Sequence, residues 1–194
     1  MNENPFITRN VQPGSIAFLF PIGENETSLL DRLENQKWWG QIVGPHGTGK
    51  STLLATLIPA IERRGRHPLL IELRNRQRRI PVNLKHEKAI DSLTVLIVDG
   101  YEQLGLLSRF FLRRFCRQHG IGLVVTSHKK VGLPTLLHTE GRLKTTQQIV
   151  SQLLENNEDS IIKPDEVARS FEAHNGNVRE VLFEMYDIFE NRYR

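Results

Sequence analysis

The sequence predicts an α/β fold in which strands and helices alternate around a parallel sheet. Four short apolar runs are typical of strands, at 38–43, 68–73, 95–98 and 121–126. Helical patterns fall between them at 50–64 and 103–119, and a further short strand is predicted at 136–138. Parallel strands need such crossover helices, so the alternation favours a parallel sheet between helical layers.

Composition limits the class of protein. The 194 residues are 39% hydrophobic and 25% charged, which suits one ordinary domain or one domain with a small appendage. A single cysteine, Cys116, excludes an intrachain disulfide and favours a reducing, cytoplasmic location. The apolar run 16–20 stops at Pro21, far short of the ~20 residues that span a bilayer, so we expect no membrane association.

Three regions follow one another along the chain. Residues 1–36 are predicted to be an irregular lead-in with one short strand at 16–20, and residues 37–142 an α/β core. Residues 143–194 contain only helical patterns and are predicted to form a small helical lid. Its first helix is expected to begin at a capping box formed by Thr145 and Gln148.

A glycine-rich segment follows the first predicted core strand and precedes a helix. Its sequence, GPHGTGKS at 44–51, matches the phosphate-binding pattern G-x-x-x-x-G-K-[ST], the Walker A motif. Glycines let backbone N–H groups surround phosphate oxygens, the lysine contacts the β and γ phosphates, and the serine hydroxyl binds Mg²⁺. The predicted nucleotide-binding residues here are Gly44, Pro45, His46, Gly47, Thr48, Gly49, Lys50, Ser51 and Thr52.

A buried strand, 95–98, delivers Asp99 at its carboxyl end, where ligands bind in open α/β sheets. We therefore expect Asp99 to serve Mg²⁺ together with Ser51. Many ATPases place a glutamate directly after this aspartate, but here that position is Gly100. Glu102 is the next candidate for orienting the attacking water, if Gly100 permits a tight turn. With Lys50 and Asp99 it completes the predicted catalytic set.

Together these motifs resemble the AAA+-type ATPases of the ASCE P-loop class, over about residues 38–190. The resemblance implies a three-layer P-loop NTPase with a small C-terminal helical lid. In that family a polar residue ending the fourth strand senses the γ-phosphate, and here the candidates are Thr126, Ser127 and His128, with no single one favoured. The segment Gly176–Glu180 matches the family's G-N-x-R helix start, whose arginine, here Arg179, folds over the nucleotide.

The resemblance implies a Mg²⁺-dependent protein that binds ATP, releases ADP and couples hydrolysis to movement of the lid. A small-molecule or nucleotide kinase is an alternative, because Asp99-Gly100-Tyr101 is similar to the D-G-F of nucleotide kinases. A slow, non-enzymatic ATP switch is another, supported by Gly100. The segment between Ser127 and Leu136 is too short for the helix that carries a trans-acting arginine. A monomer, or an assembly completed by another protein, is therefore as consistent with the sequence as a ring.

Two basic clusters stand out against a net charge of +4. One contains Arg74, Arg76, Arg78 and Arg79, and the other contains Arg109, Arg113 and Arg117 at helical spacing. The helix predicted at 103–119 carries the second cluster, and its predicted buried face contains Leu104, Leu107, Phe111 and Phe115. Both clusters are expected to be solvated surface, with contact to nucleic-acid phosphates as the alternative use. A protein partner or self-association is a separate expectation for the chain, tied to neither cluster.

Overall fold

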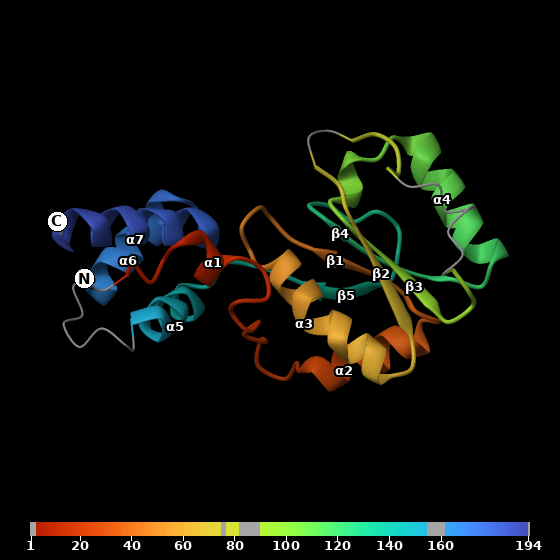
Figure 1. Cartoon of the computed structure of the whole chain (residues 1–194), viewed down its shortest axis with the longest axis horizontal. Helices are drawn as coiled ribbons and strands as arrows, with labels where there is room; N and C mark the ends of the chain where they lie inside the picture. Colours follow the sequence, from red (N-terminus) through yellow and green to blue (C-terminus); the bar gives the residue numbers. More distant parts are fainter. Residues whose placement is uncertain (1–2, 75–76, 82–89, 155–161, 194) are drawn as a thin grey trace. The chain divides into compact units, whose positions relative to one another are not determined.

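The computed structural model describes residues 3–74, 77–81, 90–154 and 162–193. The chain divides into two compact units, which are described separately. The sheet unit comprises Phe20–Gly44 and Leu54–His138. The helical unit comprises Met1–Leu19, Pro45–Leu53 and Thr139–Arg194. Both units are drawn in Figure 1.

The sheet unit is built on five parallel strands (Figure 1). In chain order the strands are β1 (Trp39–Val43), β2 (His67–Glu72), β3 (Thr94–Asp99), β4 (Gly122–Ser127) and β5 (Thr135–His138). Their order across the sheet is β2-β3-β4-β1-β5, and every neighbouring pair is parallel. The two central strands β3 and β4 are buried almost throughout, as their apolar β-branched runs predicted. The predicted parallel α/β sheet is confirmed.

Helices flank this sheet. They are α2 (Glu26–Asn35), α3 (Lys50–Arg63), the one-turn 3₁₀-helix η1 (Tyr101–Gln103) and α4 (Leu106–Gln118). A core of the sheet unit packs side chains of β2, β3 and β4 against Leu112 and Cys116 of α4. Burial raises the pKa of the Cys116 thiol to about 12, so this cysteine is an inert apolar packing residue.

The helical unit consists of α1 (Thr8–Val11), α5 (Leu143–Leu154), α6 (Pro164–Ala173) and α7 (Val178–Tyr193). Its core joins these helices to the N-terminal segment, where Phe6 meets Phe189 edge to face at 6.3 Å. Arg192 of α7 pairs with Glu166 of α6, and this contact lowers the pKa of the Glu166 carboxyl to about 2. The Glu166 carboxylate also accepts the Lys163 backbone N–H and so caps α6.

Three local predictions were wrong. The strand expected at 16–20 is absent, and only Pro13 and Ile16 form an isolated bridge. The lead-in instead contains α2, whose start is fixed by Asn25 and Ser28, each side chain bonding the other's backbone N–H. Helix α5 begins at Leu143, so the expected capping pair Thr145 and Gln148 lies inside the helix.

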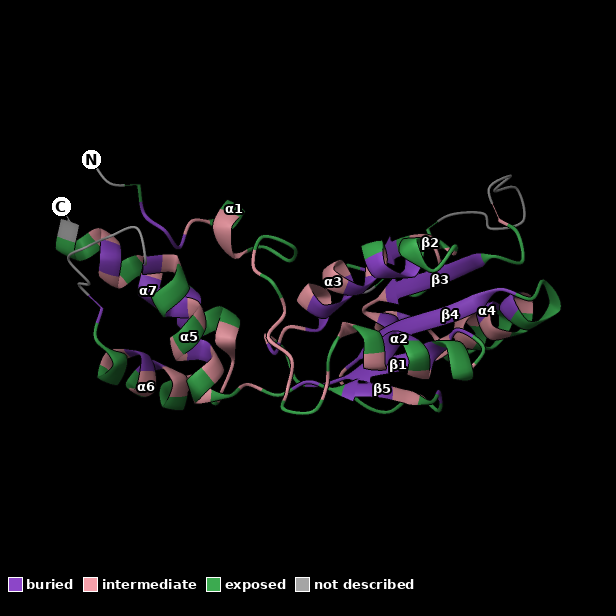
Figure 2. Cartoon of the chain, turned by 90° about the horizontal axis from the view of Figure 1, so that it is seen from below, coloured by how far each residue is buried: buried purple, intermediate pink, exposed green. Residues whose placement is uncertain are grey.

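The buried face predicted for the helix at 103–119 was only half right, since Leu104 is buried and Phe115 packs against the core of the sheet unit. Leu107 and Phe111 are 74% and 62% exposed, whereas Leu112 and Cys116 are buried. Apolar residues lie on more than one face of α4, so periodicity alone does not identify the face that is buried. Figure 2 shows the outward surface of α4 as exposed. Arg76 of the first basic cluster lies outside the described residues.

Within the described part of the chain, no helix is both long enough and apolar enough to cross a membrane.

Candidate functional site

The phosphate-loop segment connects the end of β1 at Val43 to the start of α3 at Lys50. Gly47 and Gly49 have positive φ angles of +68° and +86°, a left-handed backbone that glycine adopts without steric cost. These two left-handed residues turn the chain tightly into the N-terminus of α3. The N-terminus of a helix carries a partial positive charge, which is suited to an anion.

The loop is held closed by contacts to one carbonyl. Lys50 is only 8% exposed, and its Nζ donates to the Pro45 carbonyl oxygen at 2.5 Å. The Thr48 hydroxyl donates to the same oxygen at 2.9 Å and pairs with the Thr139 hydroxyl at 2.8 Å. The lysine ammonium therefore lies against the loop itself, which is the place that a phosphate-binding lysine requires. The next residues, Ser51 and Thr52, occupy the first turn of α3 and are half-buried.

The start of α7 packs against this loop within the helical unit. A Cβ placed on Gly47 would lie 1.6 Å from Asn177 Oδ1 and 3.3 Å from Arg179 Cβ. A side chain at this position would displace the Asn177 side chain, so the backbone of the loop lies directly beside the predicted arginine. Asn177 was not singled out by the sequence reasoning. Its signal was its position before a helix, where an asparagine oxygen accepts a backbone N–H, here that of Glu180.

In the sheet unit, Asp99 ends β3 and is held by the end of the neighbouring strand β4. The Thr126 hydroxyl donates to Asp99 Oδ1 and accepts the Gly100 N–H at 2.9 Å. The Ser127 hydroxyl is fully buried and faces the turn, where it accepts the Lys129 N–H at 3.4 Å. Thus Thr126 orients the predicted magnesium-binding carboxylate, while Ser127 supports the backbone.

Glu102 and His128 form a pair that the sequence did not predict. His128 Nε2 lies 2.8 Å from Glu102 Oε1, and His128 Nδ1 lies 3.2 Å from the Gly44 carbonyl oxygen. Both side chains are mostly buried, at 25% and 29% exposed. Both ring nitrogens of His128 therefore face oxygen atoms of other groups. The pair ties Glu102 to the first glycine of the GPHGTGKS motif.

Gly100 makes this arrangement possible. Its φ of +81° is left-handed, and a Cβ there would lie 3.0 Å from the Leu73 carbonyl oxygen. The resulting sharp turn leads directly into η1 and presents Glu102 beside His128. The second carboxylate oxygen of Glu102 is buried and has no hydrogen-bond partner among the described residues. A buried carboxylate oxygen without a partner is costly, and it suits a group that bonds a water during the reaction.

The described residues contain no group of three or more histidine, cysteine, aspartate or glutamate side chains arranged to hold a metal ion. Mg²⁺ needs few protein ligands, because it keeps waters and takes phosphate oxygens. The hydroxyl of Ser51 and the carboxylate of Asp99 are donors of the type it prefers.

No family model matches the chain, and no curated protein matches its sequence. Solved structures do match its fold. A DNA replication initiation factor is 17% identical with a TM-score of 0.58 over 90% of this chain and 66% of that one. AMPPCP-bound DnaA from Aquifex aeolicus is 19% identical with a TM-score of 0.54 over 84% of this chain and 61% of that one. A single-residue variant of RuvB from Thermotoga maritima is 12% identical with a TM-score of 0.50, covering 84% and 67%.

These neighbours are AAA+ ATPases of the ASCE P-loop class. The fold of this chain is therefore an AAA+-type P-loop fold, with a parallel sheet, flanking helices and C-terminal helices, as predicted. This chain spans only about two thirds of the length of these neighbours. The likeness establishes the fold, and the chemistry depends on this chain's own residues.

Proposed function

We propose that this protein binds MgATP and hydrolyses it, coupling the reaction to movement of its C-terminal helical lid, residues 143–194. The AAA+-type fold supports nucleotide binding in general. The observation that carries the proposal is the loop: left-handed Gly47 and Gly49, a helix beginning at Lys50, and the lysine ammonium held against the loop by Pro45. That combination serves a polyphosphate better than any other ligand.

Roles are proposed for the loop and for Asp99 and Thr126 outside it. The backbone N–H groups from His46 to Thr52 are proposed to bind phosphate oxygens, and Lys50 to neutralise the β and γ phosphates. Ser51 and Asp99 serve the magnesium ion, which supplies charge neutralisation at the phosphates when it is bound. Thr126 keeps Asp99 in place through its hydroxyl. The neutral loop backbone and the buried lysine thus account for binding, whereas turnover needs a further group.

That further group is proposed to be Glu102, which orients the attacking water, with His128 fixing the carboxylate. Arg179 is proposed to report the γ-phosphate to the lid, because the start of α7 lies against Gly47 of the loop. Loss of the γ-phosphate on conversion of ATP to ADP would remove the partner of this arginine, a local change of charge with a structural readout.

A slow ATP switch is the second candidate, and one observation favours it. Glu102 is engaged by His128 rather than turned freely to solvent. If the second carboxylate oxygen of Glu102 stays buried when nucleotide is bound, it does not reach the water and turnover is slow. A kinase is separated from both by transfer of the γ-phosphate to an acceptor other than water.

The location and partners belong to the same proposal. The buried Cys116 is compatible with the reducing cytoplasm, where we place the protein. One solved neighbour is the replication initiator DnaA bound to AMPPCP and single-stranded DNA, 18% identical with a TM-score of 0.57. Nucleic acid, a protein partner and self-association are therefore the classes that a partner search should include.

The test is titration of the purified chain with a fluorescent ATP analogue in the presence of Mg²⁺. Lys50→Ala should weaken binding by about a hundred-fold or more, because a buried charge that contacts phosphate is removed. Lys144→Ala is the matched control, since Lys144 is an exposed lysine of the same unit. Equal affinity for wild type and Lys50→Ala would refute the assignment of the loop.

A further inference from the structure

The outward side of α4 exposes four large apolar side chains in succession. Leu106, Leu107, Phe110 and Phe111 are 81%, 74%, 61% and 62% exposed, and together they are called the α4 patch. They form two pairs spaced by four residues, so both pairs lie along the helix surface. Isolated exposed leucines are ordinary, but four adjacent ones of this size mark an interaction surface.

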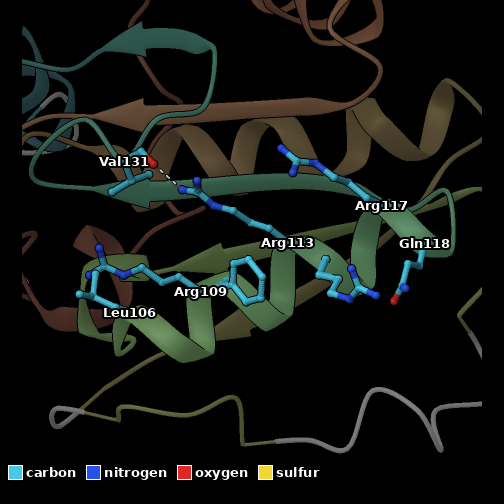
Figure 3. A pocket seen from close by; sticks show the side chains of 8 residues that line it. Leu106, Arg109, Arg113, Arg117, Gln118 and Val131 are labelled. Carbon is cyan, nitrogen blue, oxygen red and sulfur yellow. Dashed lines mark hydrogen bonds between the residues drawn. The ribbon is translucent and has the colours of Figure 1, made fainter.

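A row of arginines runs along the same helix. Arg109, Arg113 and Arg117 follow each other at intervals of four residues, which places them about 6 Å apart along the helix. Aromatic rings hold them: the guanidinium carbons of Arg109 and Arg113 lie 5.4 and 5.6 Å from the Tyr101 ring, and that of Arg117 lies 5.3 Å from Trp39. Figure 3 shows these side chains along the groove beside α4.

Hydrogen bonds to uncharged groups fix the first two arginines further. Arg109 donates to the Leu104 and Glu102 carbonyl oxygens at 2.8 and 2.6 Å. Arg113 donates to the Tyr101 hydroxyl at 3.0 Å and to the Val131 carbonyl oxygen. These contacts order the guanidinium groups without neutralising them. A partner that meets them therefore loses little side-chain entropy on the protein's side.

The charge of this surface is uncompensated within the described part of the chain. Helix α4 contains no acidic residue, and none of its arginines forms an ion pair with a described carboxylate. A groove of about 500 Å³ lies along the helix, lined mainly by Leu106, Arg109, Phe110, Arg113, Arg114 and Arg117. Its lining combines apolar side chains at one end with positive charge along its length.

We propose that the α4 patch, its arginine row and the neighbouring Arg114 of the groove dock an acidic amphipathic helix of a partner protein. Carboxylates four residues apart on that helix match the arginine spacing, and its apolar side chains cover the leucines and phenylalanines. A second copy of this chain is a poorer occupant, because α4 facing α4 brings like charges together. The proposal does not depend on the nucleotide chemistry.

The apolar composition favours protein over nucleic acid. Within the α4 patch, the two most exposed side chains are Leu106 and Leu107, which are aliphatic and offer no ring for base stacking. The rings of Phe110 and Phe111 pack edge to face against each other at 5.6 Å and 73°. The patch is therefore suited to packing with aliphatic side chains.

The experiment uses a displayed library of helical peptides, each about five turns long, with a fixed leucine seam and glutamate, lysine or glutamine at the flanking positions. Selection on the full chain should enrich glutamate over lysine by about ten-fold or more at flanking positions four residues apart. Binding of the selected peptide, followed by fluorescence anisotropy, should fall by about ten-fold in Phe111→Ser and in Arg114→Glu. Both residues are exposed, so neither change is expected to unfold the protein.

Ile22→Ser is the control, because Ile22 is fully exposed and lies outside α4. It should leave peptide binding unchanged. Absence of enrichment, enrichment of lysine, or binding that Phe111→Ser and Arg114→Glu leave intact would each overturn the proposal. A labelled oligothymidylate provides the last arm: if it binds and the same two variants abolish that binding, the surface is a nucleic-acid site and the proposal is wrong.

Discussion

The phosphate loop and the Glu102–His128 pair reach their geometries in different ways. The loop is a contiguous segment whose glycines, lysine and serine follow one another, and its closing contacts to Pro45 are local. The pair joins Glu102 of η1, which follows β3, to His128, which follows β4, and these two strands are neighbours only in the folded sheet. The loop can therefore form from local sequence, whereas the pair exists only after the parallel sheet has assembled.

Because of this difference, we expect the phosphate loop and the Glu102–His128 pair to control different properties of the protein. The loop carries the charge and the N–H groups that bind phosphate, so it should control affinity. The pair has one carboxylate oxygen held by His128 and a second one buried without a partner among the described residues, so it should control turnover. Variants that change one property and not the other sharpen the distinction, and variants that change both would break it.

The largest separation is expected from Glu102→Gln. Removing the carboxylate charge should lower ATP turnover by about a hundred-fold to a thousand-fold, because a positioned general base contributes on that order. MgATP affinity should stay near that of the wild type. Phosphate release and nucleotide titration measure the two effects, with Glu62→Gln, an exposed glutamate of α3, as the control. Unchanged turnover would remove Glu102 from the mechanism.

A smaller effect, on affinity, is expected from Gly47→Ala. Gly47 and Gly65 both have left-handed backbones, at φ +68° and +73°, so alanine costs about 1 kcal/mol of folding stability at either position. Only at Gly47 would the new Cβ meet another group, Asn177 Oδ1. Gly47→Ala should therefore also weaken MgATP binding by about ten-fold, while Gly65→Ala leaves binding unchanged. Equal loss of affinity in both variants would show that strain, and not the packing beside the loop, is responsible.

The smallest effect is expected from Arg179→Ala. Loss of one charge-assisted contact should weaken ATP binding by about five- to ten-fold and ADP binding by less. Competition titrations with the two nucleotides measure the ratio, and Arg169→Ala on the exposed side of α6 is the control. If ATP and ADP affinities change equally, Arg179 does not report the γ-phosphate.

The sequence predicted what depends on contiguous residues. The strands β1 to β5, the phosphate-loop pattern and Asp99 at a strand end follow from apolar runs and glycine spacing. The position of His128 against Glu102 could not be predicted, because it depends on the relative register of β3 and β4. The exposed α4 patch was missed for a related reason. Apolar side chains lie on two faces of that helix, and only the tertiary packing of Leu112 and Cys116 selects the buried one.

Helix α2 shows a further limit. Its start depends on a reciprocal cap between Asn25 and Ser28, a variant of the usual Ser/Thr-to-Glu pattern. Its buried side chains are Leu29, Leu30 and Leu33, and three leucines over so short a stretch are too weak a pattern to predict a helix. A pattern this short predicts a helix only when the surface against which the helix packs is known.

The most direct test of the central claim is phosphate release from MgATP by the purified chain, measured beside Lys50→Ala. We predict measurable release by the wild type and its loss in the variant. Release at the same rate in both proteins would contradict the claim, because the activity would then not come from the loop. Tight MgATP binding by the wild type with no release would contradict the proposal that the chain alone is an ATPase, and a screen for phosphate acceptors would then separate a switch from a kinase.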